Sequence, residues 1–113
     1  MNSSFTQNDI FYALAEPTRR NIVEMLAKRG QLSASDISIK FKVSAPAISQ
    51  HLKVLREAKV VRVEKRAQQR IYQLNPDSME ELETWVKKMT RMWSERFDRL
   101  DLVLQELKKR PRL

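Results

Sequence analysis

Apolar and polar residues recur with two different periods along this chain, and each period predicts one type of element. Between residues 44 and 55, Ile48, Leu52 and Leu55 follow the i, i+4, i+7 spacing of one helix face. Ser44 can cap the first turn, where Pro46 is tolerated because N–H groups there have no intrahelical acceptor. The opposite side of this segment is small or polar and carries no acid; it consists of Pro46, Ala47, Ser49, Gln50 and Lys53. The pattern predicts a helix after Ser44 with an unusually small, acid-free outer face.

Three further helices are predicted before this one. The first covers residues 9–15, and the second begins at Pro17, which fits a first helical turn, and ends at Gly30, where a left-handed residue is favoured. Ser33 and Asp36 have the spacing of a capping box that opens a short third helix. The third and fourth helices together predict a helix-turn-helix over about residues 33–58. The expected apolar contacts of the first three helices are Ile10, Phe11, Leu14, Ile22, Val23, Met25, Leu26, Ile37 and Phe41.

The segment after residue 60 changes to a period of two. Val61 and Val63 alternate with Arg62 and Glu64, and further along the chain Tyr72 and Leu74 alternate with Ile71 and Gln73. Alternation rich in β-branched and aromatic residues predicts two strands, and the polar stretch 64–70 between them predicts the tip of a hairpin. A helix-turn-helix followed by a basic hairpin, here over about residues 60–75, predicts a mainly α fold with a small β-hairpin (α+β), the winged helix-turn-helix.

A last, long helix is predicted from about residue 77 to 109. Asn75 and Pro76 end the strand, Asp77 and Glu80 have capping spacing, and no breaker follows before Pro111. Such a helix is roughly 48 Å long, more than the roughly 34 Å diameter of a compact domain of this size. Because it stays apolar to its end, we expect a symmetric dimer built on it, with help from the first helix. The interface residues expected are Phe5, Phe11, Leu14, Trp85, Met89, Met92, Trp93, Phe97, Leu100 and Leu104.

Charge is concentrated rather than evenly spread. The net charge is +8, and residues 53–73 hold seven basic residues against two acidic ones. This excess directly follows the acid-free helix face, which favours nucleic acid as the partner. A helix that enters the major groove needs small residues at its start and no acids facing phosphates. The basic C-terminal residues 108–113 are interpreted as a solvated end rather than a DNA arm.

Single residues can be assigned to this expected DNA surface. Ser49 and Gln50 are predicted to reach base edges, since Gln can pair bidentately with adenine and Ser can donate or accept. Small residues at the helix start suit the groove entrance, later basic residues suit phosphates, and the wing suits the backbone or the minor groove. The full predicted DNA-binding set is Ser44, Pro46, Ala47, Ser49, Gln50, Lys53, Arg56, Lys65, Arg66, Gln68 and Arg70.

Other function classes find little support. The 113 residues favour one domain, 1–113. No cysteine is present, and neither a membrane span nor a signal peptide is recognisable, so a cytoplasmic, nucleoid-associated protein is expected. There is no phosphate loop, nucleophile motif or metal-ligand cluster, so neither an enzyme nor a cofactor is predicted. His51 is the only histidine and is interpreted as packed or phosphate-facing rather than as a metal ligand.

Three alternatives stay open. The basic surface could bind DNA or RNA without sequence preference. The Met- and Trp-rich last helix could bind a partner protein, with DNA incidental. The cluster of Trp85, Met89, Met92 and Trp93 could line a ligand pocket, although the core of a dimer explains it better.

Taken together, three stretches resemble the ArsR-type winged-helix repressors: "ALAEPTRRNIVEML" at 13–26, "SAPAISQHLKVLREAKVV" at 44–61 and "RAQQRIYQL" at 66–74. The resemblance implies a dimeric operator-binding repressor released by a signal, with recognition helix 44–53 and wing 65–70. Family members that sense metal carry a Cys-rich motif in the third helix or His and Asp in the last one. Here the third helix reads "SASDISIKF" and the last lacks histidine, so neither metal site can form. The last helix, "WVKKMTRMWSERFDRLD", resembles that of the metal-independent subgroup. The inducer of such a member would be a small molecule or a partner protein. Lys59 and Ala67 stand where this family often has glycine.

Overall fold

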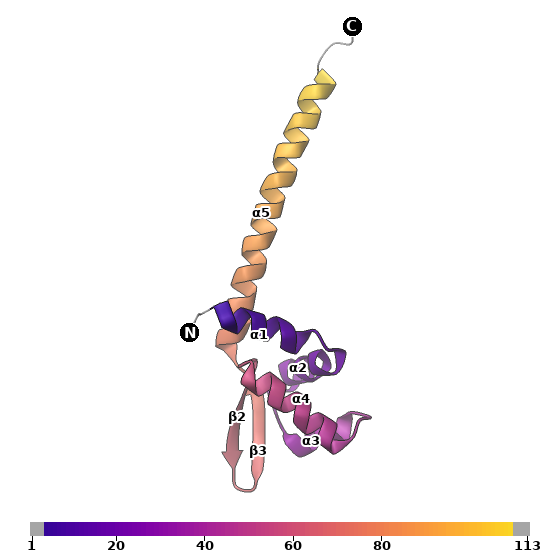
Figure 1. Cartoon of the computed structure of the whole chain (residues 1–113), viewed down its shortest axis with the longest axis vertical. Coiled ribbons are helices and arrows are strands. Elements are labelled where there is room, and N and C mark those ends of the chain that lie inside the picture. Colours follow the sequence, from indigo (N-terminus) through magenta and orange to yellow (C-terminus); the bar gives the residue numbers. More distant parts are fainter. Residues whose placement is uncertain (1–3, 110–113) are drawn as a thin grey trace. The chain divides into compact units, whose positions relative to one another are not determined.

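The computed structural model describes the backbone of residues 4–109 and the side chains of residues 9–109. The chain divides into two units, residues 1–82 and residues 83–113. The first unit contains four helices, a small sheet and the start of a fifth helix, and the second contains the rest of that helix (Figure 1). The prediction of a single domain stays a prediction. The mainly helical winged helix-turn-helix fold is confirmed.

The first unit is built on four helices that share one core. They are α1 (Ser4–Leu14), α2 (Pro17–Arg29), α3 (Ala34–Lys40) and α4 (Ala45–Glu57). The predicted helical stripes supply the buried residues of this core, among them Ile10, Ile22, Leu26, Ile37, Ile48, Leu52 and Leu55. The first helix begins at Ser4 and ends at Leu14, whereas the sequence predicted residues 9–15. No glycine or proline interrupts the chain before Pro17, so nothing local prevents the earlier start.

Side-chain caps position the two helices of the helix-turn-helix. The Oγ of Ser33 accepts a hydrogen bond from the Asp36 N–H at 3.1 Å, and that of Ser44 accepts one from the Ala47 N–H at 3.3 Å. Both caps were predicted. Gly30 ends α2 with φ 87° and ψ −58°, so its φ is positive as predicted, although ψ lies outside the left-handed helical region. Its N–H donates to the Leu26 carbonyl at 2.8 Å.

The sheet has three antiparallel strands in the order β1-β3-β2, one more than predicted. The added strand β1 (Gln31–Ser33) pairs with β3 (Gln69–Leu74), and β3 also pairs with β2 (Val61–Arg66). Three residues are too few to show a period of two, which is why the pattern missed β1. The predicted hairpin tip over 64–70 was too long, because the ladder continues to the pair Arg66–Gln69 and leaves only Ala67 and Gln68 as the loop. Charged side chains do not prevent backbone pairing at a solvent-exposed hairpin end.

Two residues without glycine's freedom adopt positive φ values. Lys59, directly after α4, has φ 61°, and Ala67, at the first loop position of the hairpin, has φ 55°. These are the two positions at which the ArsR-type resemblance led us to expect glycine. The Lys59 carbonyl accepts hydrogen bonds from the Asn75 Nδ2 at 2.9 Å and from the Ser78 Oγ. These bonds hold the exit of the recognition helix against the start of the last helix.

The last helix, α5 (Pro76–Lys109), begins one residue before the predicted start. The cap is Asn75 rather than Asp77, because the Asn75 Oδ1 accepts from the Asp77 N–H at 3.2 Å. Pro76 takes the first helical position, where its missing N–H costs nothing. Within the first unit, Ser78 is buried, and Met79 and Leu82 pack against the core.

Candidate nucleic-acid interface

Helix α4 has one buried face and one exposed face. Ile48, Leu52 and Leu55 are buried, whereas the outer face is open to solvent. Of the predicted contact residues, Ala47 is half-buried and the others on this segment are exposed, namely Ser44, Pro46, Ser49, Gln50, Lys53 and Arg56. The i, i+3, i+4 and i+7 relation places Pro46, Ser49, Gln50 and Lys53 in one stripe. The side chains of this stripe are small at its N-terminal end, and Lys53 makes it basic further along.

No acidic residue occurs from residue 37 to residue 56, a stretch that includes most of α3, the turn and nearly all of α4. It carries Lys40, Lys42, Lys53 and Arg56, all exposed. Acids of the helix-turn-helix therefore occur only at Asp36 and Glu57, and the stretch between them presents positive charge, which favours phosphate contact.

The wing brings two cations side by side. Lys65 and Arg70 are cross-strand partners in the hairpin, on the same face as the pairs Val63–Tyr72 and Val61–Leu74. Like charges directly opposite each other destabilise a strand pair. In residues 9–109, the side chains described, neither Lys65 nor Arg70 is in an ion pair. An anion between them would relieve their repulsion.

Arg66 differs from its neighbours in the wing. Its Nη2 donates to the Glu64 Oε2 at 3.0 Å and to the Gln31 Oε1 at 3.2 Å, which joins the hairpin to β1. Because Glu64 already neutralises this guanidinium, Arg66 is less available for phosphate than Lys65 or Arg70. Gln68 lies exposed in the hairpin loop.

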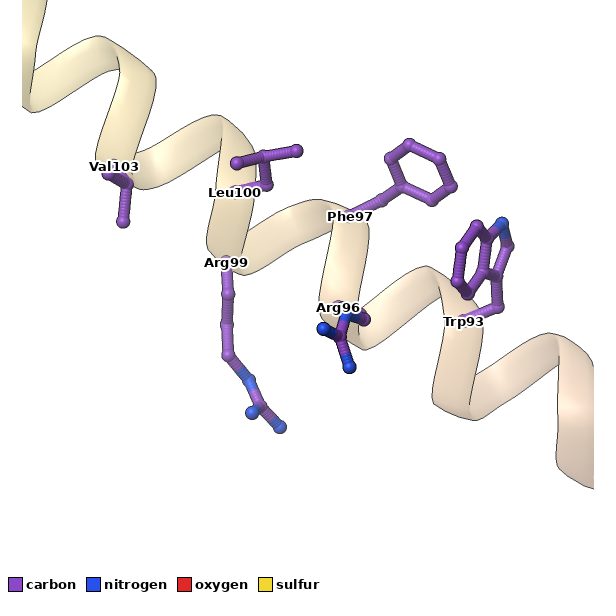
Figure 2. Close-up of a pocket in the computed structure, with 6 residues that line it drawn as sticks. All are labelled: Trp93, Arg96, Phe97, Arg99, Leu100 and Val103. Carbon is purple, nitrogen blue, oxygen red and sulfur yellow. The ribbon is translucent and has the colours of Figure 1, made fainter.

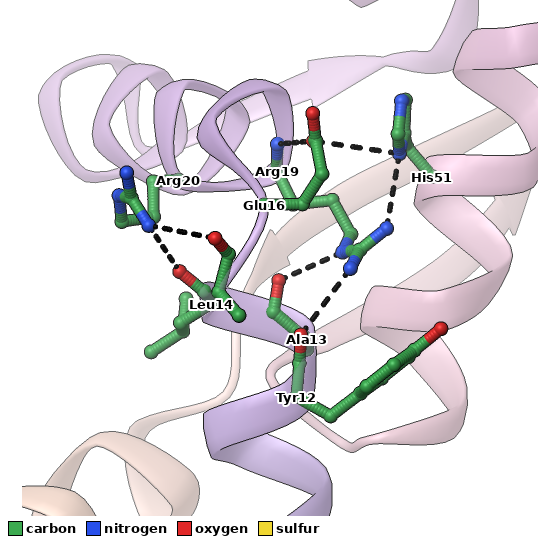
Figure 3. A network of polar contacts seen from close by, with 8 residues as sticks. Tyr12, Ala13, Leu14, Glu16, Arg19, Arg20 and His51 are labelled. Atoms are coloured by element: carbon green, nitrogen blue, oxygen red, sulfur yellow. Dashed lines mark hydrogen bonds and ion pairs between the residues drawn. The ribbon is translucent and has the colours of Figure 1, made fainter.

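A polar network joins α4 to the first two helices (Figure 3). The Arg19 side chain, from α2, is buried; its Nε donates to the Ala13 carbonyl at 2.8 Å and its Nη2 to the Tyr12 carbonyl at 3.2 Å. The Arg19 Nη1 lies 3.3 Å from the Nδ1 of His51 on α4. A guanidinium can only donate, so this Nδ1 accepts and the proton of the neutral ring lies on Nε2. His51 is thus a packed residue, one of the two roles predicted for it.

Glu16 completes the network as the cap of α2. Its Oε2 accepts from the Arg19 N–H at 3.0 Å and lies 3.8 Å from the His51 Nδ1. Burial by itself raises the pKa of Glu16, but the hydrogen bond from the Arg19 N–H, the charge of His51 and hydrogen bonds from Thr18 outweigh it, so the pKa is lowered. The Glu16–His51 contact is an ion pair only when His51 is protonated, and the bond from Arg19 needs the same Nδ1 unprotonated. The contact with Arg19, at 3.3 Å, is the shorter of the two and lies within hydrogen-bond range, whereas the Glu16 oxygen lies 3.8 Å away.

The part of α5 in the second unit carries an apolar stripe. Trp93, Phe97 and Leu100 lie along one side of the helix while Arg99 points away from them (Figure 2), and the rings of Trp93 and Phe97 meet edge to face with centroids 4.9 Å apart. Large apolar residues stay exposed from Val86 to Leu107. Of the other residues predicted at a dimer interface, Met92 and Leu104 are exposed in this unit, and Trp85 and Met89 are half-buried.

The predicted interface residues of α1 have different environments. Phe11 is partly exposed, whereas Leu14 is half-buried and packs against the core of the first unit. The side chain of Phe5 lies outside the described residues. Leu14 therefore contributes to the core of a single chain, independently of any partner chain.

Sequence reasoning missed the roles of Arg19 and Glu16. Neighbouring Arg19 and Arg20 look alike in the sequence, yet only Arg19 turns inward, since Arg20 donates to the Leu14 and Ala15 carbonyls from an exposed position. The one local signal is the position of Glu16, directly before a proline that starts a helix. In residues 9–109, His, Cys, Asp and Glu form no group of three suited to a metal ion. No helix in the part of the chain that the structure describes is long and apolar enough to span a membrane.

These elements define a winged helix-turn-helix protein in which the exposed face of α4 and the neighbouring wing are basic. Residues 6–63 match the family model described as "Bacterial regulatory protein, arsR family". The chain belongs to this family, and it is a DNA-binding regulator of transcription.

Known proteins of the same family are similar over most of the chain. The transcriptional repressor SdpR of Bacillus subtilis is 37% identical over 79 residues, which cover 70% of this chain and 87% of SdpR. The regulator Rv2034 of Mycobacterium tuberculosis is 43% identical over 82 residues, covering 73% of each protein. The crystal structure of the ArsR family regulator RHA00566 matches with a TM-score of 0.73 and 26% identity, covering 82% of this chain and 95% of that one.

Proposed function

We propose that this protein is a homodimeric repressor that binds one pseudo-palindromic double-stranded operator in the cytoplasm and does not sense metal. The observation that carries the proposal is the outer face of α4, small at its start and free of acids until Glu57, its last residue, next to a wing with two adjacent cations. Helix α4 would enter the major groove, with Ser49 and Gln50 at base edges. Lys53, Arg56, Lys65 and Arg70 would contact phosphates.

The dimer is supported by α5. Its stripe from Val86 to Leu107 exposes large apolar side chains that one chain leaves in water, and contiguous exposed apolar surface marks interaction sites. A second copy brings an identical stripe, so a symmetric pair would cover both at once. All residues lining the hollow beside Trp93 and Phe97 belong to this one helix, so it is an open face rather than an enclosed ligand pocket.

The small number of possible metal ligands in the sequence supports a signal other than a metal ion. The sequence contains no cysteine and one histidine, and that histidine is engaged by Arg19. Reversible thiol chemistry is therefore absent, and a metal site made of soft or imidazole ligands has no basis. Release by a small molecule or a partner protein is the remaining type of signal.

The proposal is tested by titrating the purified protein onto promoter DNA from its own gene, with excess random DNA as competitor, at two salt concentrations. Retained binding to one short inverted repeat, with two chains per site, supports it. Gln50→Ala should then reduce the preference for the operator over random DNA more than it weakens binding to random DNA. Lys53→Ala is the matched variant one turn on, and it should weaken both equally.

Two outcomes would assign the surface differently. Binding that random DNA removes completely indicates a non-specific nucleic-acid-binding protein. A partner protein retained on the last helix after nuclease treatment, without any footprint on DNA, indicates a protein-interaction module.

A further inference from the structure

A groove of about 390 Å³ runs between α3 and the N-terminal half of α4. Its floor contains the buried Ile48 and Leu52, and its rims carry the hydroxyls of Ser35, Ser38 and Ser49. Ile39 lines the same groove with 81% of its surface exposed, the most exposed of the large apolar side chains described. None of the contacts predicted from the sequence lies on α3.

The charge around this groove selects the kind of partner. Six of the eight residues that line the groove belong to the acid-free stretch 37–56, and Lys40 and Lys42 come just after Ile39 in the chain. The exposed Asp36 beside Ser35 is the one acid next in sequence to a lining residue. A partner that covers Ile39 must therefore tolerate exposed lysines and supply both an apolar surface and hydrogen-bond acceptors for three serines. One strand of DNA does this, because its deoxyribose presents C–H groups between phosphates rich in acceptors.

The position of the groove relative to Ser49 also indicates a DNA strand as the partner. When α4 lies in the major groove, a sugar–phosphate strand borders it on each side, and the first helix of a helix-turn-helix crosses that backbone. Ser49, expected at base edges, and Ile39 line one groove, so a strand that passes α4 would reach α3.

We propose that this groove seats one sugar–phosphate strand of the bound DNA. Ile39 packs on a deoxyribose, and the hydroxyls of Ser35 and Ser38 donate to an adjacent phosphate. The proposal rests on the proposed function and adds α3 to the DNA-binding surface. Because the contact is to the backbone, it sets register and affinity rather than base preference.

Hydroxyl-radical footprinting tests the proposal, because it reports solvent access to each deoxyribose. The full-length protein and Ile39→Ser would be compared on the operator, with Ile39→Leu as the matched variant that keeps an apolar side chain. An exposed residue can be changed without unfolding the protein, and thermal unfolding of each variant checks this.

We expect Ile39→Ser to lose protection at one or two sugars in each half-site, while the rest of the footprint stays. Its Kd should rise roughly tenfold with the salt dependence unchanged, since an apolar contact releases no counterions. Ile39→Leu should keep both the protection and the affinity. Ser35→Ala with Ser38→Ala should weaken binding to operator and random DNA by the same factor.

An unchanged footprint and Kd for Ile39→Ser, with a clear wild-type footprint, would overturn the proposal and leave the proposed function intact. If Ile39→Ser instead lost self-association in sedimentation with its footprint unchanged, the groove would belong to a second copy. No wild-type footprint at all would overturn both the function and this inference.

Discussion

The guanidinium of Arg19 on α2 lies 3.3 Å from the Nδ1 of His51 on α4 while it also donates to two carbonyls at the end of α1. One buried side chain thus connects three helices and contacts the recognition helix one residue after Gln50. His51 is held from inside the fold, which restrains the orientation of the outer face of α4. The stability of the first unit and the position of this outer face therefore depend on the same contact.

Arg19→Met should lower the free energy of unfolding by about 2–3 kcal/mol, because the Ala13 carbonyl in a buried bond, the Tyr12 carbonyl in a part-buried one and the His51 Nδ1 lose their donor. Arg20→Met is the matched control, since Arg20 also donates to carbonyls at the end of α1 but does so in water. It should cost less than about 1 kcal/mol. Urea unfolding of both variants measures the difference. Equal losses would show that the burial of Arg19 carries no energetic weight.

The lowered pKa of Glu16 predicts a pH dependence. A carboxyl whose folded pKa lies below its unfolded value binds fewer protons when folded, so its stabilisation is complete above the unfolded pKa and is lost as the pH falls through the folded one. The stability difference between wild type and Glu16→Gln should shrink as the pH falls below the ordinary pKa of glutamate. Urea titrations of both proteins at several pH values measure it. A difference that grows as the pH falls below the ordinary pKa of glutamate would reverse the assigned direction.

The positive φ values of Lys59 and Ala67 predict stabilising substitutions. A side chain in the left-handed region costs about 1–2 kcal/mol, and glycine gives back about 0.4–1 kcal/mol through unfolded-state entropy. Lys59→Gly and Ala67→Gly should each raise the free energy of unfolding by about 0.5–1 kcal/mol. Ala58→Gly is the control beside Lys59; with φ −78° and a buried side chain, Ala58 should be destabilised by the same change. Thermal unfolding of the three variants measures these changes. If the melting temperatures of all three shifted in the same direction, the positive φ values of Lys59 and Ala67 would be contradicted.

Lys65 and Arg66 of the wing are predicted to contribute differently to the salt dependence of DNA binding. Lys65→Gln should reduce the slope of log K against log salt by about 1 for each wing, as expected for one lost phosphate contact. Arg66→Gln should change the slope less, because Glu64 already pairs with this residue. DNA titrations from low to high salt measure both slopes. If Arg66→Gln has the larger effect, the ion pair with Glu64 opens on binding.

Much of the fold could be predicted from local patterns, and the failures have physical causes. Ile48, Leu52 and Leu55 determine the buried face of α4 by spacing alone, and Ser33 and Ser44 cap within three residues. Strand β1 is too short for any period, and its pairing with β3 depends on residues forty positions away. The inward turn of Arg19 likewise depends on α1 and α4, which no pattern around residue 19 records. The DNA-binding residues selected from charge and size stay a prediction, and the proposed contact of Ile39 required knowing that α3 and α4 line one groove.

The dimer prediction can be tested with two leucines. Leu100 and Leu102 are 51% and 65% exposed, yet at about 100° per residue they lie on nearly opposite sides of α5. Leu100 lies on the side of Trp93 and Phe97 (Figure 2), so Leu100→Glu would place a charge inside the proposed interface. It should weaken dimerisation at least tenfold in sedimentation equilibrium, because an unpaired carboxylate would have to be desolvated. Leu102→Glu adds the same charge to the far side and should leave the dimer intact. Equal effects of the two changes, or none from either, would mean that the dimer is not built on the Trp93–Phe97 side of α5.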